Sequence, residues 1–188
     1  MTDAEIFLKN LNEHRETAAK MDVLARSVAE AGSLIRETLA NGGRVMFCGN
    51  GGSAADAQHL AAELSGRYLK NRSPLAGMAL HCDTSALTAI ANDFSFDEIY
   101  SRQVKAHGRK GDLLVGISTS GNSKNVLNAM LAAHELEVKT IAMTGESGGK
   151  MAEIADVLLN VPSSFTPRIQ EMHILIGHTL CEAAEKDF

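Results

Sequence analysis

Residues 44–53 are Arg-Val-Met-Phe-Cys-Gly-Asn-Gly-Gly-Ser, a short apolar run that stops at a glycine-rich turn. Before this stretch, an amphipathic pattern with three- and four-residue spacing ends at Asn41-Gly42-Gly43, as a helix does. After it, Ala54-Ala55-Asp56-Ala57 begins a second helical pattern. The stretch is therefore predicted to be a buried strand followed by a tight turn into a helix.

Four more short apolar runs follow, separated by longer amphipathic segments. Buried helix segments are the alternative explanation, but the shortness of the runs and their flanking glycines favour strands. Continuous apolar strands separated by helices indicate a parallel sheet covered on both faces. We therefore predict an α/β protein, a three-layer α/β/α sandwich around a five-stranded parallel sheet. The predicted strands are 45–48, 78–80, 113–117, 140–143 and 157–161.

The chain has 188 residues, which fits one domain, and neither a linker nor an internal repeat divides it. We expect about two helices in residues 1–42, a sheet core in 43–188, and a last helix from about 167 to 185. The N-terminal helices have more apolar positions than one sheet face needs, so packing between subunits is expected. The alternative is that they cover their own sheet. These positions are Leu8, Leu11, Leu24, Val28, Ile35 and Leu39.

The composition argues against several classes of protein. The chain is 45% hydrophobic and 22% charged, which is typical of a folded globular domain. A net charge of −5, no Trp and no dense Lys/Arg run argue against a nucleic-acid ligand. The N-terminus is too polar for a signal peptide, and no apolar run reaches the ~18 residues of a membrane span. Three scattered cysteines without a CxxC pair indicate reduced thiols, so a cytoplasmic protein is expected.

The turn Gly49-Asn50-Gly51-Gly52-Ser53 is a candidate anion-binding loop. Glycines let the backbone approach a ligand closely, and the free N–H groups at the start of a helix favour an anion. A plain strand-to-helix turn would also explain these residues. The pattern is neither GxGxxG nor the Walker motif, so it indicates neither a dinucleotide nor a nucleoside triphosphate.

A second loop of this kind follows the predicted strand 113–117. Ser118-Thr119-Ser120-Gly121-Asn122-Ser123 places four hydroxyl groups around one glycine where a helix is predicted to begin. Such hydroxyls can surround a phosphate with neutral donors. Because a helix cap needs only one of them, anion binding is the preferred interpretation.

The helix after the first loop carries polar side chains suited to metal or acid–base chemistry. His59 and Glu63 are four residues apart and project from one helix face, on which Asp56 also lies. A solvated polar face is the usual explanation for such a pair. The nearby anion loop favours a functional explanation here.

The last predicted helix offers a second set. Gln170 and His178 are eight residues apart and fall within one broad stripe of the helix. By periodicity alone, His173 is as plausible a functional histidine as His178.

Together these motifs resemble the sugar isomerase (SIS) domain family and, within it, the phosphoheptose isomerases. The run Gly-Ile-Ser-Thr-Ser-Gly-Asn-Ser at 116–123 resembles the Ser/Thr-rich loop with which SIS domains hold phosphosugars. The resemblance extends over nearly the whole chain and implies a flavodoxin-like sheet. Its other motifs are at 48–53, 56–59, 62–64, 66–68, 91–93 and 168–171.

The resemblance implies an activity and an assembly. It implies an aldose–ketose isomerase that converts sedoheptulose 7-phosphate to D-glycero-D-manno-heptose 7-phosphate through an enediolate. This reaction would supply heptose for cell-surface polysaccharide such as lipopolysaccharide. The resemblance also implies a cytoplasmic homotetramer with sites at subunit contacts and one zinc ion per subunit.

The resemblance also implies roles for individual residues. Glu63 and His178 match the catalytic acid and base, Asp56 matches a residue that orients the site, and His173 is left a structural role. The zinc ligands match His59, Glu63, Gln170 and His178, a nitrogen and oxygen set that suits zinc. Substrate contacts match Asn50, Gly51, Gly52, Ser53, Glu63, Arg67, Asn92, Asp93, Ser118, Thr119, Ser120, Ser123 and Gln170, with Arg67 expected across a subunit contact.

Two alternative functions remain. The first is a different SIS isomerase or phosphosugar hydrolase, against which Asn92-Asp93 and the motif at 66–68 argue. The second is a non-enzymatic regulator of similar fold that binds a replication initiator protein; that branch lacks counterparts of Glu63 and His178. Pro167 departs from the pattern, because some members have Asp there, so a difference in substrate preference is expected rather than a different reaction.

Overall fold

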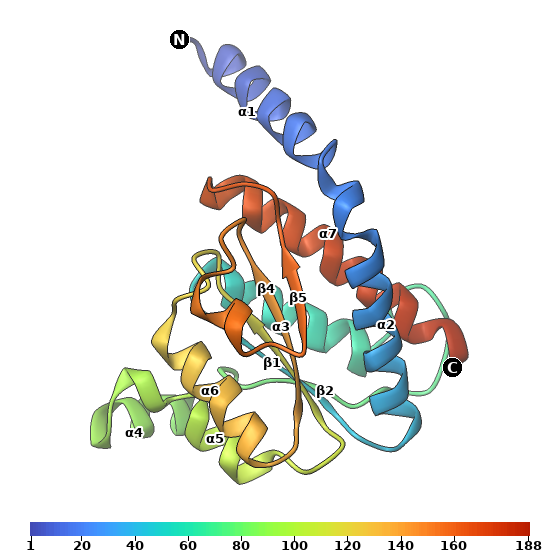
Figure 1. Ribbon diagram of the computed structural model, residues 1–188, viewed down its shortest axis with the longest axis vertical. Coiled ribbons are helices and arrows are strands. Elements are labelled where there is room, and N and C mark those ends of the chain that lie inside the picture. Colours follow the sequence, from blue (N-terminus) through green and yellow to red (C-terminus); the bar gives the residue numbers. More distant parts are fainter.

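The computed structural model describes residues 1–188 and contains one five-stranded parallel sheet with helices on both faces (Figure 1). The strands lie in the order β2-β1-β3-β4-β5, and every neighbouring pair is parallel. This arrangement confirms the predicted α/β sandwich and its flavodoxin-like order. The strands are β1 (Val45–Gly49), β2 (Gly77–Ala79), β3 (Leu113–Ile117), β4 (Lys139–Thr144) and β5 (Val157–Asn160).

The helices are α1 (Asp3–Ala18), α2 (Ala25–Ala40), α3 (Gly52–Ser65), α4 (Thr84–Asp93), α5 (Ser101–His107), α6 (Lys124–Glu135) and α7 (Thr166–Ala184). Figure 1 shows α4, α5 and α6 on one side of the sheet and α2 and α7 on the other. Alternate strand residues divide between the two faces, as the pleat requires. Val45 and Phe47 pack in the core cluster with α2, α3 and α7, whereas Met46 and Cys48 pack with α5 and α6.

The observed boundaries differ from the predicted ones mainly at the first loop. Helix α3 begins at Gly52, two residues earlier than the apolar pattern indicated. Gly51 precedes it with φ of 56°, in the left-handed region that favours glycine, and this residue turns the chain sharply into the helix. The predicted helix after Asp22 begins with a 3₁₀ turn, Met21–Leu24, before α2.

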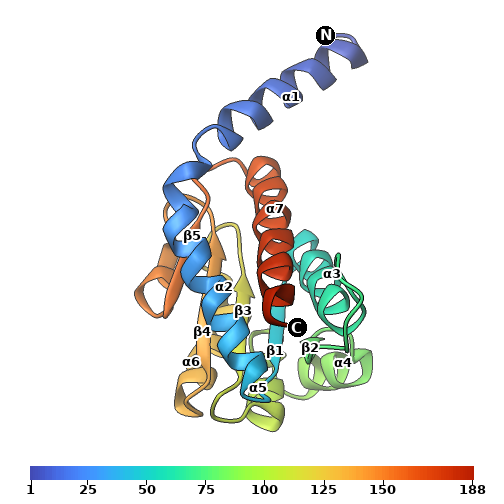
Figure 2. The ribbon, with the colours of Figure 1, turned by 90° about the vertical axis from the view of Figure 1, so that its right-hand side faces the viewer.

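The two N-terminal helices have different surroundings. Helix α2 covers its own sheet, with Ala31, Ile35 and Leu39 buried in the core, as the alternative prediction had it. Helix α1 instead projects away from the rest of the chain (Figures 1 and 2) and buries only Thr17. The exposed side chain of Phe7 leaves an apolar surface on α1, for which packing between copies stays a prediction. None of the seven α-helices is long and apolar enough to cross a membrane.

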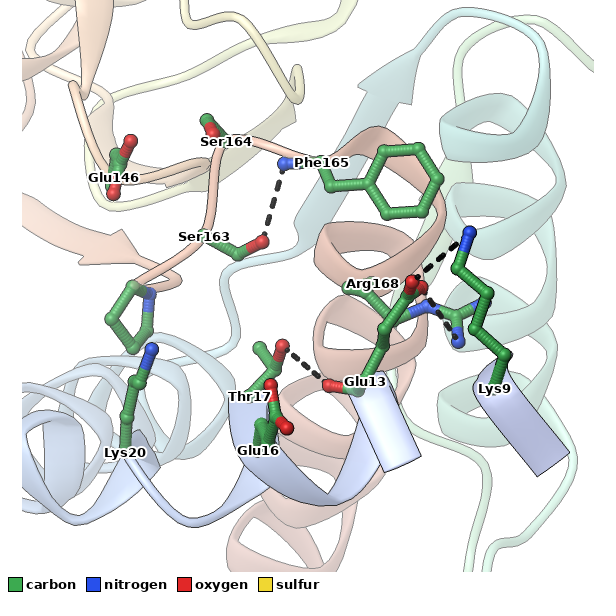
Figure 3. A pocket seen from close by; sticks show the side chains of 11 residues that line it. Lys9, Glu13, Glu16, Thr17, Lys20, Glu146, Ser163, Ser164, Phe165 and Arg168 are labelled. Atoms are coloured by element: carbon green, nitrogen blue, oxygen red, sulfur yellow. Dashed lines mark hydrogen bonds and ion pairs between the residues drawn. The ribbon is translucent and has the colours of Figure 1, made fainter. Parts of the chain in front are cut away.

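Arg168 at the start of α7 holds the last turns of α1. Its buried guanidinium donates to the carbonyl of Asn10 and pairs with Glu171 at 2.8 Å, and His14 lies 2.8 Å from the same carboxylate. Figure 3 shows Arg168 and Lys9 converging on Glu13 in a hollow of about 520 Å³ between α1 and the segment 162–168. Arg168 and Glu171, both in the motif at 168–171, therefore have a structural role.

The sheet positions both candidate anion loops at one edge. The chain leaves β1 in one direction to form β2 and later returns to form β3 on the other side of β1. Ligands of open α/β sheets bind where the strand order reverses in this way, beyond the carboxyl ends of the strands. Gly49 and Ile117 are paired in the sheet register, so the loops that follow them begin side by side.

Candidate functional site

The two loops are joined by a pair of amide side chains. Asn50 donates from Nδ2 to Oδ1 of Asn125 at 2.9 Å, and Asn125 donates back to Asn50 at 2.8 Å. Each amide uses one N–H group and one oxygen lone pair in this way, so the pair fixes the orientation of the Asn50 side chain in the first loop. Sequence reasoning missed Asn125, which is only 2% exposed, because it resembles any polar residue in the first turn of a helix.

The first loop is shaped by close contacts to it. The hydroxyl of Tyr100 donates to the carbonyl oxygen of Gly49 at 2.5 Å and fixes the end of β1. A Cβ atom at Gly52 would lie 2.5 Å from Nε2 of Gln170, so the Gln170 side chain would have to move to admit a larger residue here. Ser53 is buried in the first turn of α3.

The hydroxyl groups of the second loop converge. Oγ of Ser118 lies 2.9 Å from Oγ of Ser123 and 3.4 Å from Oγ of Ser120. Gly121, with φ of 64°, lets the loop pass close to the backbone of Gly148. Each hydroxyl can donate or accept, so these groups can turn toward the oxygens of an anion. A hollow of about 320 Å³ beside the loop includes Thr119 and Ser120 in its wall.

The helices α3 and α7 run side by side and bring three ligand-type side chains together. Nε2 of His59 lies 2.9 Å from Oε1 of Glu63 and 3.4 Å from Nε2 of His178. One ligand atom from each of the three residues lies within 4.8 Å of the other two. The ring of His178 also packs against His59 edge to face, with centroids 5.1 Å apart.

This group fits zinc. Two nitrogens that bind one tetrahedral zinc ion, at Zn–N distances of about 2.0–2.1 Å, lie about 3.3 Å apart. The observed separation of the two imidazole nitrogens is 3.4 Å. Nearby, Oδ2 of Asp56 is buried without a hydrogen-bond partner. Burial raises the pKa of the Asp56 carboxyl, whereas His59 and His178 oppose the increase. An unpartnered carboxyl oxygen beside two ligand-type histidines is the kind of group that suits the surroundings of a bound cation.

The structure separates the two histidines of α7 that periodicity could not distinguish. His173 is fully buried, and its Nε2 donates to the carbonyl oxygen of Thr144 at 3.1 Å. Burial lowers the pKa of His173 to about 4, although the Thr144 hydrogen bond opposes this decrease. His178 lies on the face toward α3, with His59 and Glu63. His173 is therefore a core residue, as the resemblance implied and periodicity left open.

Comparison with known proteins places this architecture in a family. Residues 7–145 match the family model described as SIS domain. The chain belongs to the SIS-domain family.

The relatives of this SIS-domain chain include named enzymes. It is 62% identical over 161 residues to the phosphoheptose isomerase of Rhodospirillum rubrum, covering 86% of each chain. It is 54% identical over 181 residues to that of Aliarcobacter butzleri, covering 96% of each. A solved phosphoheptose isomerase from Neisseria gonorrhoeae has a TM-score of 0.93 and 48% identity, covering 98% of this chain and 99% of that one.

Gln170, one of the four expected zinc ligands, lies apart from the other three. Gln170 contacts Gly52 at the first loop, whereas His178 lies beside His59, two turns further along α3. Eight residues of helix advance about 12 Å, so Gln170 and His178 lie about two turns apart on α7. Within a single chain, the structure brings His59, Glu63 and His178 together, whereas the side chain of Gln170 is directed toward Gly52.

Three other expected substrate residues lie on the surface. Arg67 is exposed in the segment after α3 and has no ion pair within the chain. Asn92 and Asp93 are the last residues of α4, a helix without buried residues. The side-chain amide of Asn92 donates a hydrogen bond of 2.8 Å to the carboxylate of Asp93. None of the three contacts the His59–Glu63–His178 group.

Proposed function

We propose that the chain is a phosphoheptose isomerase that converts sedoheptulose 7-phosphate to D-glycero-D-manno-heptose 7-phosphate in the cytoplasm and supplies heptose for cell-surface polysaccharide. The observation that carries this proposal is the grouping of His59, Glu63 and His178 on two helices that begin beside a hydroxyl-rich loop. Relatives at 54–62% identity that bear the isomerase name support it. They give no support to the alternative of a non-enzymatic regulator.

The reaction moves a carbonyl group between two neighbouring carbons. A base must remove a proton next to the carbonyl, and an acid must protonate the neighbouring oxygen or carbon. Glu63 would act as the base and His178 as its partner, each through an atom not bound to the ion, since a lone pair that binds zinc cannot also accept a proton. The two side chains lie close enough together to serve adjacent carbons. Zinc held by His59, Glu63 and His178 would supply positive charge that stabilises the negative charge developing on the substrate oxygens.

The phosphate group would bind at the other end of the same helices. The hydroxyls of Ser118, Ser120 and Ser123, together with the backbone N–H groups that open α3, offer neutral donors to an anion. The phosphate does not react. Its binding energy instead fixes the sugar for proton transfer.

We further propose a homotetramer with one zinc ion per subunit and with sites at subunit contacts. The separation of about 12 Å between Gln170 and His178 along α7 supports a site shared between copies, because Gln170 is directed toward its own first loop and the Gln170 of another chain would complete the ligand set. The exposed Arg67, Asn92 and Asp93 would contribute to a neighbouring site in the same way. Phe7, 64% exposed on the projecting α1, offers apolar surface for the assembly.

Incubation of the purified chain with sedoheptulose 7-phosphate tests the activity. NMR should detect the aldose phosphate, a chelator should stop its formation, and added zinc should restore it. If no aldose forms with zinc present, the proposed reaction is wrong. If turnover continues unchanged after verified removal of metal, the role of zinc is wrong.

Mixing two inactive variants tests the shared site. Gln170→Ala and His178→Gln chains, unfolded together and refolded at equal amounts, should regain activity, because about a quarter of shared sites would then be intact. The matched control mixes Glu63→Gln with His178→Gln, whose residues belong to one chain's group. Recovery in neither mixture would contradict a site shared through Gln170.

A further inference from the structure

The ring of Tyr68 stacks on the imidazole of His178. The two ring centroids are 5.2 Å apart, and the planes differ by 25°. His59 contacts another side of the same imidazole edge to face, at 5.1 Å and 70°. His178 makes only one hydrogen bond within the chain, through Nε2, which is its ligand atom. Histidines that bind metals usually have their other nitrogen held by an outer partner. Here an aromatic contact takes that place.

A buried carboxylate holds the backbone of Tyr68. Glu185, just after α7, accepts from the N–H groups of Tyr68 at 2.7 Å, Leu69 at 2.9 Å and Lys70 at 2.9 Å. The fourth donor is Nε of Arg72, at 3.0 Å. Burial by itself would raise the pKa of Glu185, but these donors outweigh it and lower the pKa to about 2. The carboxylate is therefore charged at any physiological pH.

Arg72 connects the same segment to the helix that carries Glu63. Its guanidinium donates to the carbonyl oxygens of Glu63 and Leu64, each at 2.9 Å. The side chains of Arg72 and Glu185 are 2% and 1% exposed. The Arg72–Glu185 ion pair thus joins the C-terminal ends of α3 and α7. It also fixes residues 66–72, the segment that follows α3 and contains Tyr68.

Stabilisation alone does not account for this arrangement. Removing two charges from water is costly, and a buried ion pair is often no more stabilising than apolar residues of the same volume. Of the segment's other side chains, Arg67, Leu69 and Lys70 are exposed, and only Tyr68 packs partly against the core. What the ion pair achieves is a fixed backbone position for Tyr68, the residue of this segment that packs on His178.

We propose that Tyr68 is a positioning residue: its ring fixes the orientation of the His178 imidazole, and the Glu185–Arg72 pair holds Tyr68 in place. The expected effect of Tyr68 on turnover rests on the proposed isomerase function. The contact between the two rings, and the orientation of His178 that it fixes, are independent of that function.

Three variants test the proposal kinetically. Tyr68→Ala removes the ring, Tyr68→Phe keeps it, and Leu69→Ala is the matched control, because its N–H is bound by the same carboxylate while its side chain is exposed. Loss of an outer partner of a metal-binding histidine typically costs about 10–100-fold in activity or metal affinity. Tyr68→Ala should lower kcat by about this factor with KM within about twofold. Tyr68→Phe and Leu69→Ala should match the parent. A parental kcat in Tyr68→Ala, or an equal loss in Tyr68→Phe, would overturn the proposal.

A spectroscopic measurement separates this proposal from the proposed function. NOE contacts between the rings of His178 and His59, with His178 assigned by comparison with His178→Gln, should weaken in Tyr68→Ala, where the imidazole can turn, and persist in Tyr68→Phe. If the parent protein does not isomerise the sugar, this spectroscopic result alone decides whether Tyr68 positions His178. Unchanged NOE contacts in Tyr68→Ala would then reject the positioning role, and contacts that are lost in Tyr68→Ala but kept in Tyr68→Phe would support it.

Discussion

Helix α7 carries one histidine toward the sheet and another toward α3, and their surroundings are opposite. His173 is fully buried, which lowers its pKa to about 4 although it donates to a backbone carbonyl. His178, five residues later, is partly exposed and turns Nε2 toward His59. The same side chain on the same helix is thus a core group in one place and a ligand-type group in the other. Packing, rather than residue type, decides which histidine is available for chemistry.

Among the residues where α7 faces α3, Glu63→Gln should cause the largest loss of turnover. The amide keeps the size of the side chain but cannot accept a substrate proton as a carboxylate does. Loss of a positioned base typically costs about 10²–10⁴-fold in rate. Turnover of sedoheptulose 7-phosphate and hydrogen exchange at the substrate carbon in D₂O should both fall. Glu182→Gln, on an exposed part of α7, is the control. Retention of most exchange in Glu63→Gln would show that another group is the base.

Changing each α7 histidine in turn tests the comparison directly. His178→Gln should lower the rate about 10²–10⁴-fold, because it removes the exchangeable imidazole. It should leave the urea midpoint near that of the parent. His173→Gln should keep most activity but lose about 1–3 kcal/mol of stability, since a buried polar group then lacks partners. If His173→Gln instead lost activity and His178→Gln lost stability, the roles assigned to the two histidines would be reversed.

The pH dependence of stability should reveal the buried face. The pKa of His173 is about 4 in the folded chain, below its ordinary value of 6.5, so the unfolded chain binds the proton more readily. The free energy of unfolding should therefore fall as pH decreases from about 6.5 to 4, by on the order of 3 kcal/mol. Urea titrations should show that this fall is smaller in His173→Gln. An identical pH profile in both proteins would contradict the burial of a neutral His173.

Gly177→Ala should disturb the α3-facing side by packing alone. The new Cβ would lie 2.6 Å from Cδ2 of Leu60, which is buried in the core. Overpacking of this kind typically costs about 1–3 kcal/mol, and it should also move His178 relative to His59. Urea unfolding measures the cost, and zinc affinity reports on the histidines. In a Leu60→Ala background the same substitution should cost less, because the obstructing side chain is gone. Equal costs in both backgrounds would exclude this contact as the cause.

The sequence by itself determined the layers of the fold and the character of its loops. Apolar runs such as 113–117 are buried on both faces, and this requirement leaves a local pattern that can be recognised without coordinates. The glycine turn at 49–53 and the hydroxyl loop at 118–123 are also local, because backbone freedom and side-chain type are properties of the residues themselves. Spacing alone placed His59 and Glu63 together, since both lie on one helix.

Only the tertiary structure decided what lies between segments distant in sequence. Whether His178 or His173 faces α3 depends on the rotation of α7 about its axis. Periodicity alone does not define this rotation to better than the roughly 100° between successive residues. The Asn50–Asn125 pair and the contact of Tyr68 with His178 join residues about 75 and 110 positions apart, and each partner looks ordinary in its own surroundings. Glu185 is the clearest case. A glutamate near a chain end is usually exposed, and only the convergence of three backbone N–H groups and Arg72 makes it a buried anion.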